Sequence, residues 1–144
     1  MNAGDKAAYA LKKRVQFHDT DLMGVVHHAN YLKYFEEARV DWLRWAGLEA
    51  THFPHCDRLL AVVSSGVEHL SPCRFGEELE INLQVRLQRL KIEFQYVIYN
   101  RSTGKPAAKG FTLHVLVDGA FKPKPPERRF KEFVENQKWT ETLP

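Results

Sequence analysis

Residues 30–47 read NYLKYFEEARVDWLRWAG, and this stretch predicts the one long helix of the chain. Its apolar side chains recur at helical spacing on one stripe, while its charged side chains fall largely elsewhere. Asn30 is expected to cap the start of the helix. Gly47 is expected to end it in a left-handed conformation, with Leu48 folding back on Leu43. The stripe is formed by Leu32, Phe35, Ala38, Trp42, Leu43 and Ala46.

The segments on either side of this helix change to the two-residue period of β-strands. A short strand is expected before the helix, at residues 11–17. After the helix the pattern predicts four strands in succession, at residues 60–70, 78–88, 91–100 and 107–117. Turn residues separate most of them closely, so the sheet is expected to be antiparallel. A short amphipathic C-terminal helix with Phe130, Phe133 and Val134 follows, and the fold class is therefore α+β.

Length and composition are those of one globular domain. The chain has 144 residues and 16.7 kDa, and we expect a single domain over residues 1–144 with flexible tails at 1–10 and 138–144. A 44% apolar content excludes a disordered chain. The longest aliphatic run covers residues 59–63, far below the ~20 residues of a membrane helix, and no signal segment opens the sequence. We therefore expect a cytoplasmic protein without membrane insertion, with Cys56 and Cys73 as free thiols.

Basic residues are concentrated in the later part of the chain. Residues 82–131 contain eleven Lys or Arg and three acidic residues, whereas residues 1–81 contain nine basic and twelve acidic residues. Such a segment fits nucleic acid, an anionic membrane surface or a small phosphorylated ligand. Nucleic acid is the less attractive partner, because no recognised binding motif accompanies these charges and the aromatic residues cluster in the helix.

The polar segment before the helix holds the residues best suited to chemistry. It contains Asp19, Asp21 and Gly24, and it ends in His27 and His28. Main-chain N–H groups at a helix start point outward with partial positive charge, so they can bind the oxygen of a polarised carbonyl. A carboxylate a few residues upstream could lie beside the carbonyl carbon. This pairing suits thioester hydrolysis, in which the carboxylate attacks the carbon or orients water.

Three stretches of the chain together form a specific pattern. The first begins with RVxFxDTDxxGVVHHANY at residues 14–31 and extends along the helix to Arg39. The others are HLxPCRFGxxL at residues 69–79 and GxxxHVxVD at residues 110–118. The pattern closely resembles the hotdog-fold acyl-CoA thioesterases of the 4-hydroxybenzoyl-CoA thioesterase and YbgC type, and it spans nearly the whole chain.

The resemblance implies a hotdog fold, in which an antiparallel sheet wraps around the long central helix. It also implies a homodimer or a tetramer with the site at the subunit interface, and an acyl-CoA substrate cleaved without a metal or another cofactor. Asp21 falls on the catalytic carboxylate of the family. His28 falls on the residue whose main-chain N–H holds the thioester oxygen, with its side chain available to assist. The substrate-binding residues on this basis are Gly24, Val25, Val26, His27 and Tyr31. Arg89 and Lys91, in the basic segment, are expected to meet the CoA phosphates.

Several of these residues also have simpler interpretations. Asp21 by itself could cap a turn, and Asp19 is expected to fix the loop through hydrogen bonds to main-chain N–H groups. Glu36 and Arg39, one helical turn apart, indicate a surface or interface ion pair. Adjacent histidines diverge and no third ligand has suitable spacing, so a metal site is not expected.

Two functional alternatives stay open from the sequence. One is a non-catalytic acyl-CoA or acyl-carrier binding module that uses the same cleft. The other is a hotdog dehydratase, which needs a histidine and a carboxylate facing the β-carbon of the acyl group. The acyl group itself is also open, because His27 and Met23 replace an aromatic and a small residue that are usual in the family and so change the pocket.

Overall fold

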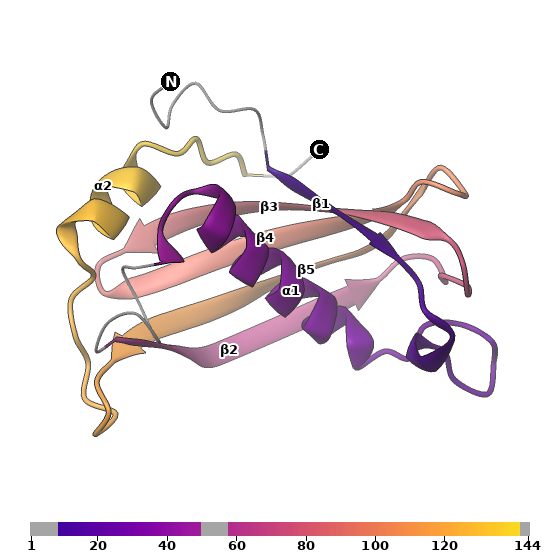
Figure 1. Cartoon of the computed structure of the whole chain (residues 1–144), viewed down its shortest axis with the longest axis horizontal. Helices are drawn as coiled ribbons and strands as arrows, with labels where there is room; N and C mark the ends of the chain where they lie inside the picture. The colour runs from indigo at the N-terminus through magenta and orange to yellow at the C-terminus, as the bar shows by residue number, and fades with distance from the viewer. Residues whose placement is uncertain (1–8, 50–57, 142–144) are drawn as a thin grey trace.

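The structure is a computed structural model that describes residues 9–49 and 58–141. Five strands form one sheet in the order β1-β3-β4-β5-β2, and every neighbouring pair is antiparallel (Figure 1). The α+β arrangement is confirmed. None of the helices within these ranges is long and apolar enough to cross a membrane. The strands are β1 (Ala10–Arg14), β2 (Leu59–His69), β3 (Glu78–Gln88), β4 (Lys91–Asn100) and β5 (Lys105–Val117). The helices are α1 (Asn30–Trp45) and α2 (Arg128–Glu135), with a 3-10 turn, η2 (Phe17–Asp19), between β1 and α1.

The strand periods predicted the sheet closely. β3 and β4 begin and end at the predicted residues, and β2 and β5 differ from prediction by one or two residues. β1 begins one residue earlier and ends three residues earlier than predicted, because its pairing with β3 ends at Arg14 and the chain then turns into η2. Side chains of a strand alternate between its two faces, and this alternation depends only on neighbouring residues. The strand bounds could therefore be predicted from the sequence.

Helix α1 lies across one face of the sheet and covers the core (Figure 1). Phe35 stacks on Tyr96 of β4 with 4.3 Å between ring centroids, and Trp42 meets Phe94 edge to face at 5.5 Å. The predicted stripe is corrected at Leu32, which is exposed. Tyr31, Phe35, Ala38 and Trp42 follow one another at intervals of three or four residues and form the buried row, whereas Leu32 lies at its outer edge. The buried residues of α1 are Tyr31, Tyr34, Phe35, Ala38, Arg39, Trp42 and Leu43.

The two ends of α1 confirm one prediction and correct another. Gly47 adopts a φ of 74°, and the N–H of Leu48 donates to the Leu43 carbonyl at 2.8 Å, as predicted. At the start, Ala29 holds the capping position and Asn30 is the first helical residue. The Asn30 side chain donates through Nδ2 to the main-chain carbonyl of Asp19 at 2.8 Å. The start of α1 is therefore tied to the preceding loop and is not capped by its own side chain.

Parts of both expected tails pack on the folded body. Tyr9 is buried, and its hydroxyl donates to Asp41 Oδ2 at 2.9 Å. Near the other terminus, the N–H of Thr140 donates to Gln84 Oε1 on β3 at 2.9 Å, and Trp139 is half-buried. These contacts hold residues 9, 139 and 140, which the sequence placed in the tails.

The molecule has two distinct ends, which Figure 1 shows at opposite ends of the strands. The first, called the loop end, contains residues 15–29, the start of α1, residues 70–77 and the β4–β5 hairpin. The second, called the α2 end, contains the end of α1, the start of β1, the β3–β4 hairpin and α2. At the α2 end, Phe133 of α2 meets Trp42 of α1 at 5.8 Å between ring centroids.

Candidate active site

Asp21 lies in a closed loop that follows η2. Thr20 and Val26 pair in an isolated antiparallel bridge, which closes the loop. Inside it, the N–H of Asp21 donates to the Val25 carbonyl at 2.9 Å, and the N–H of Gly24 donates to the Asp21 carbonyl at 2.9 Å. Gly24 has a φ of 76°, and a Cβ at this position would meet nothing within 4 Å. Backbone conformation and not space therefore selects glycine here.

The side chain of Asp21 serves the loop with one oxygen and keeps the other free. Oδ1 accepts the N–H of Met23 at 2.8 Å, which is the bond of an Asx turn. No group in residues 9–49 and 58–141 donates to Oδ2. The side chain is partly exposed. Both interpretations of Asp21 are thus compatible, because the residue caps a turn and still presents a carboxylate oxygen.

The main-chain N–H of His28, beside this loop, is a donor with no acceptor among residues 9–49 and 58–141. The amides around it are in use: His27 donates to the Asp19 carbonyl at 2.9 Å, and Asn30 donates to the His27 carbonyl at 2.9 Å. The N–H of Ala29 donates to His27 Nδ1 at 3.0 Å. Within the described part of the chain, nothing accepts from the N–H of His28. An unpaired amide just before a helix is a group that can bind a carbonyl oxygen.

The two histidine side chains next to this amide are exposed and lie together. Their rings stack with 4.3 Å between centroids, so the expectation that the two adjacent histidines diverge is wrong. Because His27 Nδ1 accepts a main-chain N–H, the proton of a neutral His27 ring sits on Nε2. The ring of His28 has no such anchor among the described residues and remains open to a ligand.

Three further residues expected to bind substrate differ in their accessibility. Gly24 is exposed and Val25 is half-buried, so both can contact a ligand at the loop. Val26 is buried, and its N–H donates to the Cys73 carbonyl at 2.8 Å. Val26 therefore holds the loop against the segment before β3. Cys73 is a buried free thiol, whereas Cys56 lies outside the described residues.

Tyr31 is packed inside the protein. Its ring meets Tyr34 at 5.9 Å and His69 at 4.9 Å between centroids, both edge to face. Burial, followed by the neighbouring Cys73 thiol, raises the pKa of the Tyr31 phenol above its ordinary value. The phenol therefore stays protonated. In one copy of the chain this ring supports the helix start from the core side.

Arg89 and Lys91 lie at the α2 end, away from the loop. Arg89 has a φ of 58° in the tight turn between β3 and β4, and Lys91 is the first residue of β4. β4 has 10 residues, and at ~3.3 Å per residue its two ends are about 30 Å apart. Its last residue, Asn100, belongs to the loop end. Within one copy of the chain, the structure does not bring Arg89 or Lys91 together with Asp21.

Arg74 is a basic residue beside the loop that the sequence did not single out. Its backbone pairs with Val25 in an isolated bridge, and its side chain is exposed. In the described ranges its guanidinium has no acidic partner, whereas Arg14 and Arg101 at the same end are paired with glutamates. Residues 71–76 read as a connection between strands. No local pattern places that connection beside a loop some fifty residues earlier.

Four large apolar side chains are also exposed around the loop. Phe17 and Phe75 meet edge to face with 5.8 Å between centroids, and Phe17 is 76% exposed. Leu22 is fully exposed and Met23 is 76% exposed. Exposed apolar groups gathered beside a few free polar groups are typical of a binding site or an interface. Only Met23 among them was expected from the sequence to affect the pocket.

Comparison with known proteins assigns the chain to a family. The thioesterase-like superfamily matches residues 15–134. The acyl-CoA thioesterase YbgC of Helicobacter pylori is 35% identical over 97 residues, which cover 64% of this chain and 70% of that protein. The 1,4-dihydroxy-2-naphthoyl-CoA hydrolase of Crocosphaera subtropica is 30% identical over 109 residues, which cover 74% of this chain and 80% of that protein. The chain belongs to the thioesterase-like superfamily.

A solved structure shows the same fold. The crystal structure of Slr0204, a 1,4-dihydroxy-2-naphthoyl-CoA thioesterase from Synechocystis, matches with a TM-score of 0.80 at 22% sequence identity. The match covers 89% of this chain and 96% of that chain. Together with the family match, it confirms the resemblance to hotdog thioesterases of the YbgC type that the sequence motifs indicated.

Proposed function

We propose that this protein hydrolyses an acyl-CoA thioester to a free acid and CoA, with Asp21 and the main-chain N–H of His28 as its catalytic groups. The observation that carries the proposal is their arrangement at the loop end. In the described part of the chain, Oδ2 of Asp21 has no donor and the N–H of His28 has no acceptor, and one short loop joins them. The family match and the CoA thioesters named for two relatives support the reaction class.

The two groups have complementary roles in this reaction. The thioester oxygen accepts the N–H of His28, which stabilises the negative charge that develops when the carbonyl carbon becomes tetrahedral. Asp21 either attacks that carbon, expelling the CoA thiolate and leaving a mixed anhydride that water hydrolyses, or takes a proton from an attacking water. Either route consumes one water, and the thiolate leaves as CoA after it gains a proton. In this proposal the exposed side chain of His28 supplies that proton.

The proposal includes a homodimer, for which β2 offers the supporting observation. β2 pairs with β5 on one side, and no strand within the described ranges pairs with its other edge. This edge runs along 11 residues, with Val62 and Val63 about half exposed. A long open edge favours pairing with another strand. A second copy would complete the hotdog arrangement in which α1 is the central helix.

The same dimer gives Arg89 and Lys91 a place in the substrate site. Two β2 strands related by a twofold axis run antiparallel, so the α2 end of one copy lies on the same side as the loop end of the other. In the proposed dimer, the two basic residues of the second copy would then be available to the phosphates of a CoA ester bound at the loop of the first. The expected role of these residues thus depends on the dimer.

Thiol release from a panel of short, long and aromatic CoA esters tests the proposal. We expect release of CoA with formation of the free acid, and loss of that release in Asp21→Asn. Binding without thiol release would instead support a non-catalytic acyl-CoA or acyl-carrier module, and enoyl formation would support a hotdog dehydratase. Transfer of oxygen-18 from labelled water into the Asp21 carboxylate during one turnover would identify the covalent route. The panel also identifies the acyl group.

A further inference from the structure

Asp19, two residues before Asp21, is a buried carboxylate with a full set of partners. It is 8% exposed and ends the η2 turn. Its Oδ2 accepts the N–H of Gln16 at 2.9 Å and the hydroxyl of Tyr34 at 2.9 Å. The ring of His18 lies within 3.3 Å of Oδ1. The Gln16 bond confirms that Asp19 fixes the loop through a main-chain N–H, and the Tyr34 bond adds a link to the second turn of α1.

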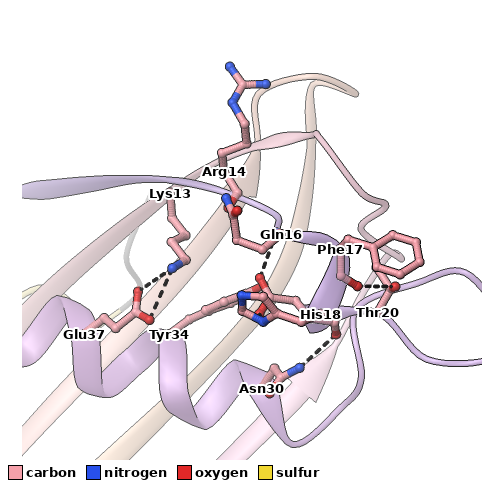
Figure 2. A network of polar contacts seen from close by, with 10 residues as sticks. Lys13, Arg14, Gln16, Phe17, His18, Thr20, Asn30, Tyr34 and Glu37 are labelled. Carbon is pink, nitrogen blue, oxygen red and sulfur yellow. Dashed lines mark hydrogen bonds and ion pairs between the residues drawn. The ribbon is translucent and has the colours of Figure 1, made fainter.

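The main-chain carbonyl of Asp19 is equally well used. It accepts the N–H of His27 at 2.9 Å and Nδ2 of Asn30 at 2.8 Å. Figure 2 shows Tyr34 and Asn30 on α1 and Gln16 just after β1; Asn30 bonds the carbonyl of Asp19, and the other two bond its carboxylate. One residue thereby connects the chain before the loop, the residue just before His28, and the first two turns of the helix.

These bonds span the two groups that the proposed reaction requires. Asp21 follows Asp19 by two residues, and His28 follows directly on His27. We propose that Tyr34 and Asn30 are positioning residues, which act through Asp19 to fix the Asp21 carboxylate relative to the main-chain N–H of His28. This inference rests on the proposed thioester hydrolysis. Neither residue touches the reacting atoms in it, and their effect is on geometry.

A matched contact elsewhere in the fold separates positioning from stability. At the α2 end, the hydroxyl of Tyr9 donates to Asp41 Oδ2 at 2.9 Å, the same length as the Tyr34–Asp19 bond. Both tyrosines are buried, and burial, followed by the bond to the carboxylate, raises the pKa of each phenol. Both therefore remain donors at neutral pH. The contacts differ in two details, because Asp41 is half-buried whereas Asp19 is buried, and the Tyr9 hydroxyl also lies 3.0 Å from the Ala38 carbonyl.

Tyr34→Phe and Tyr9→Phe test the proposal as a pair, because each removes one hydroxyl and leaves the ring in the core. We expect similar decreases in melting temperature for both. We expect kcat for a CoA ester to fall about 10-fold or more in Tyr34→Phe only, with KM within about twofold, since small displacements of reacting groups cost rate. Equal kcat values for the two variants would overturn the proposal, because the hydroxyl of Tyr34 would then be purely structural.

Asn30→Ala supplies an independent test that leaves the core intact. It removes the donor to the Asp19 carbonyl at a half-buried position, the first residue of α1, and alanine is a good helix former. We expect a fall in kcat with little change in KM. In the double variant with Tyr34→Phe, the combined fall should be smaller than the product of the two single effects, because both act through Asp19. A purely multiplicative double variant would contradict that shared route.

The outcomes also separate this inference from the proposed function. If the wild-type protein releases no thiol from any CoA ester, the function and the positioning roles fail together. If the wild type is active and Asp21→Asn is not, but Tyr34→Phe and Asn30→Ala keep the wild-type kcat, only the positioning roles fail.

Discussion

The two ends of the molecule are built from the same kind of contact and differ in what they leave unpaired. A buried tyrosine donates to an aspartate at each end, Tyr34 to Asp19 at the loop end and Tyr9 to Asp41 at the α2 end. At the α2 end the contact joins a closed aromatic core. At the loop end the same contact supports a loop with a carboxylate oxygen and an amide that lack partners among the described residues, and large apolar side chains stand exposed around it. One bonding pattern can thus serve stability in one place and, in the mechanism proposed above, the geometry of the reacting groups in another.

The largest difference between the two ends should appear when a carboxylate is neutralised at each. Asp21→Asn should lower kcat for CoA-ester hydrolysis by about 10³-fold or more, because it removes a nucleophile or general base. The fold should persist, since the amide oxygen can still accept the N–H of Met23. Asp41→Asn at the α2 end is the matched control and should keep kcat while changing thermal stability. Thiol-release kinetics and melting curves on both variants make the measurement; similar kcat values would remove Asp21 from the mechanism.

The second prediction concerns acid sensitivity, which should originate in the core toward the α2 end. His114 is fully buried on β5, and burial, followed by the positive charge of Arg39, lowers its pKa to about 3. In the unfolded chain the same ring titrates near 6.5, so the unfolded state binds more protons between about pH 3 and 6.5. The contribution of His114 to stability is therefore complete above about pH 6.5 and is lost as the pH falls toward 3. From pH 7 to pH 5 we expect a decrease of about 2 kcal/mol in the free energy of unfolding from this group.

Urea unfolding at pH 7 and pH 5 measures this term in the wild type and in His114→Gln. The glutamine side chain does not titrate, and it retains an amide that can bond Thr112. The variant should therefore lose less stability between the two pH values than the wild type. An identical pH dependence in both proteins would show that His114 is not the acid-sensitive group.

The third prediction compares two arginines that lack acidic partners among the described residues, Arg74 at the loop end and Arg129 at the α2 end. Arg74→Gln should raise KM for a CoA ester by about fivefold, because a positive charge beside the loop attracts the polyanionic CoA. It should leave KM for the corresponding N-acetylcysteamine thioester unchanged, since that substrate carries no phosphate. Arg129→Gln on α2 is the matched control and should change neither value. Arg89→Gln gives the further comparison: an effect larger than that of Arg74→Gln would favour phosphate binding by the second copy of a dimer.

The smallest expected effect comes from a pair of glycines with nearly the same backbone conformation. Gly24 at the loop end has a φ of 76°, and Gly47 at the α2 end has a φ of 74°. Replacing either with alanine should cost about 1 kcal/mol of stability, because alanine disfavours this region of backbone space. Only Gly24→Ala should also lower kcat, by about threefold, since it strains the loop that holds Asp21. Equal kcat values in the two variants would show that the loop tolerates that strain without moving Asp21.

The sequence predicted those parts of the fold that depend on local patterns. Alternation gave the bounds of β3 and β4, and the Gly47–Leu48 pair gave the end of α1. Arg39 was expected to pair with Glu36, yet it is buried and donates to the hydroxyl of Tyr96 at 3.2 Å. The direction of the Arg39 side chain depends on Tyr96, which is almost sixty positions away in sequence. Helical spacing alone does not reveal such a contact.

The sequence predicted the candidate site only in part, because some of its features depend on contacts between residues distant in sequence. The motif resemblance named Asp21 and His28, but it could not show that, within the part of the chain the structure describes, one carboxylate oxygen and one amide remain unpaired after the loop closes. Asn30 was expected to accept a main-chain N–H as a cap, whereas it donates to Asp19. Arg74 lies beside Val25 through a bridge between segments distant in sequence. Both placements follow from tertiary contacts and not from neighbours along the chain.

The most direct test of the catalytic arrangement is a crystal structure of Asp21→Asn with a slowly hydrolysed acyl-CoA bound. The account predicts the thioester oxygen within about 3 Å of the main-chain nitrogen of His28, with the carbonyl carbon facing the side chain at position 21. A thioester bound with its carbonyl away from both groups, and the N–H of His28 still without an acceptor, would contradict it.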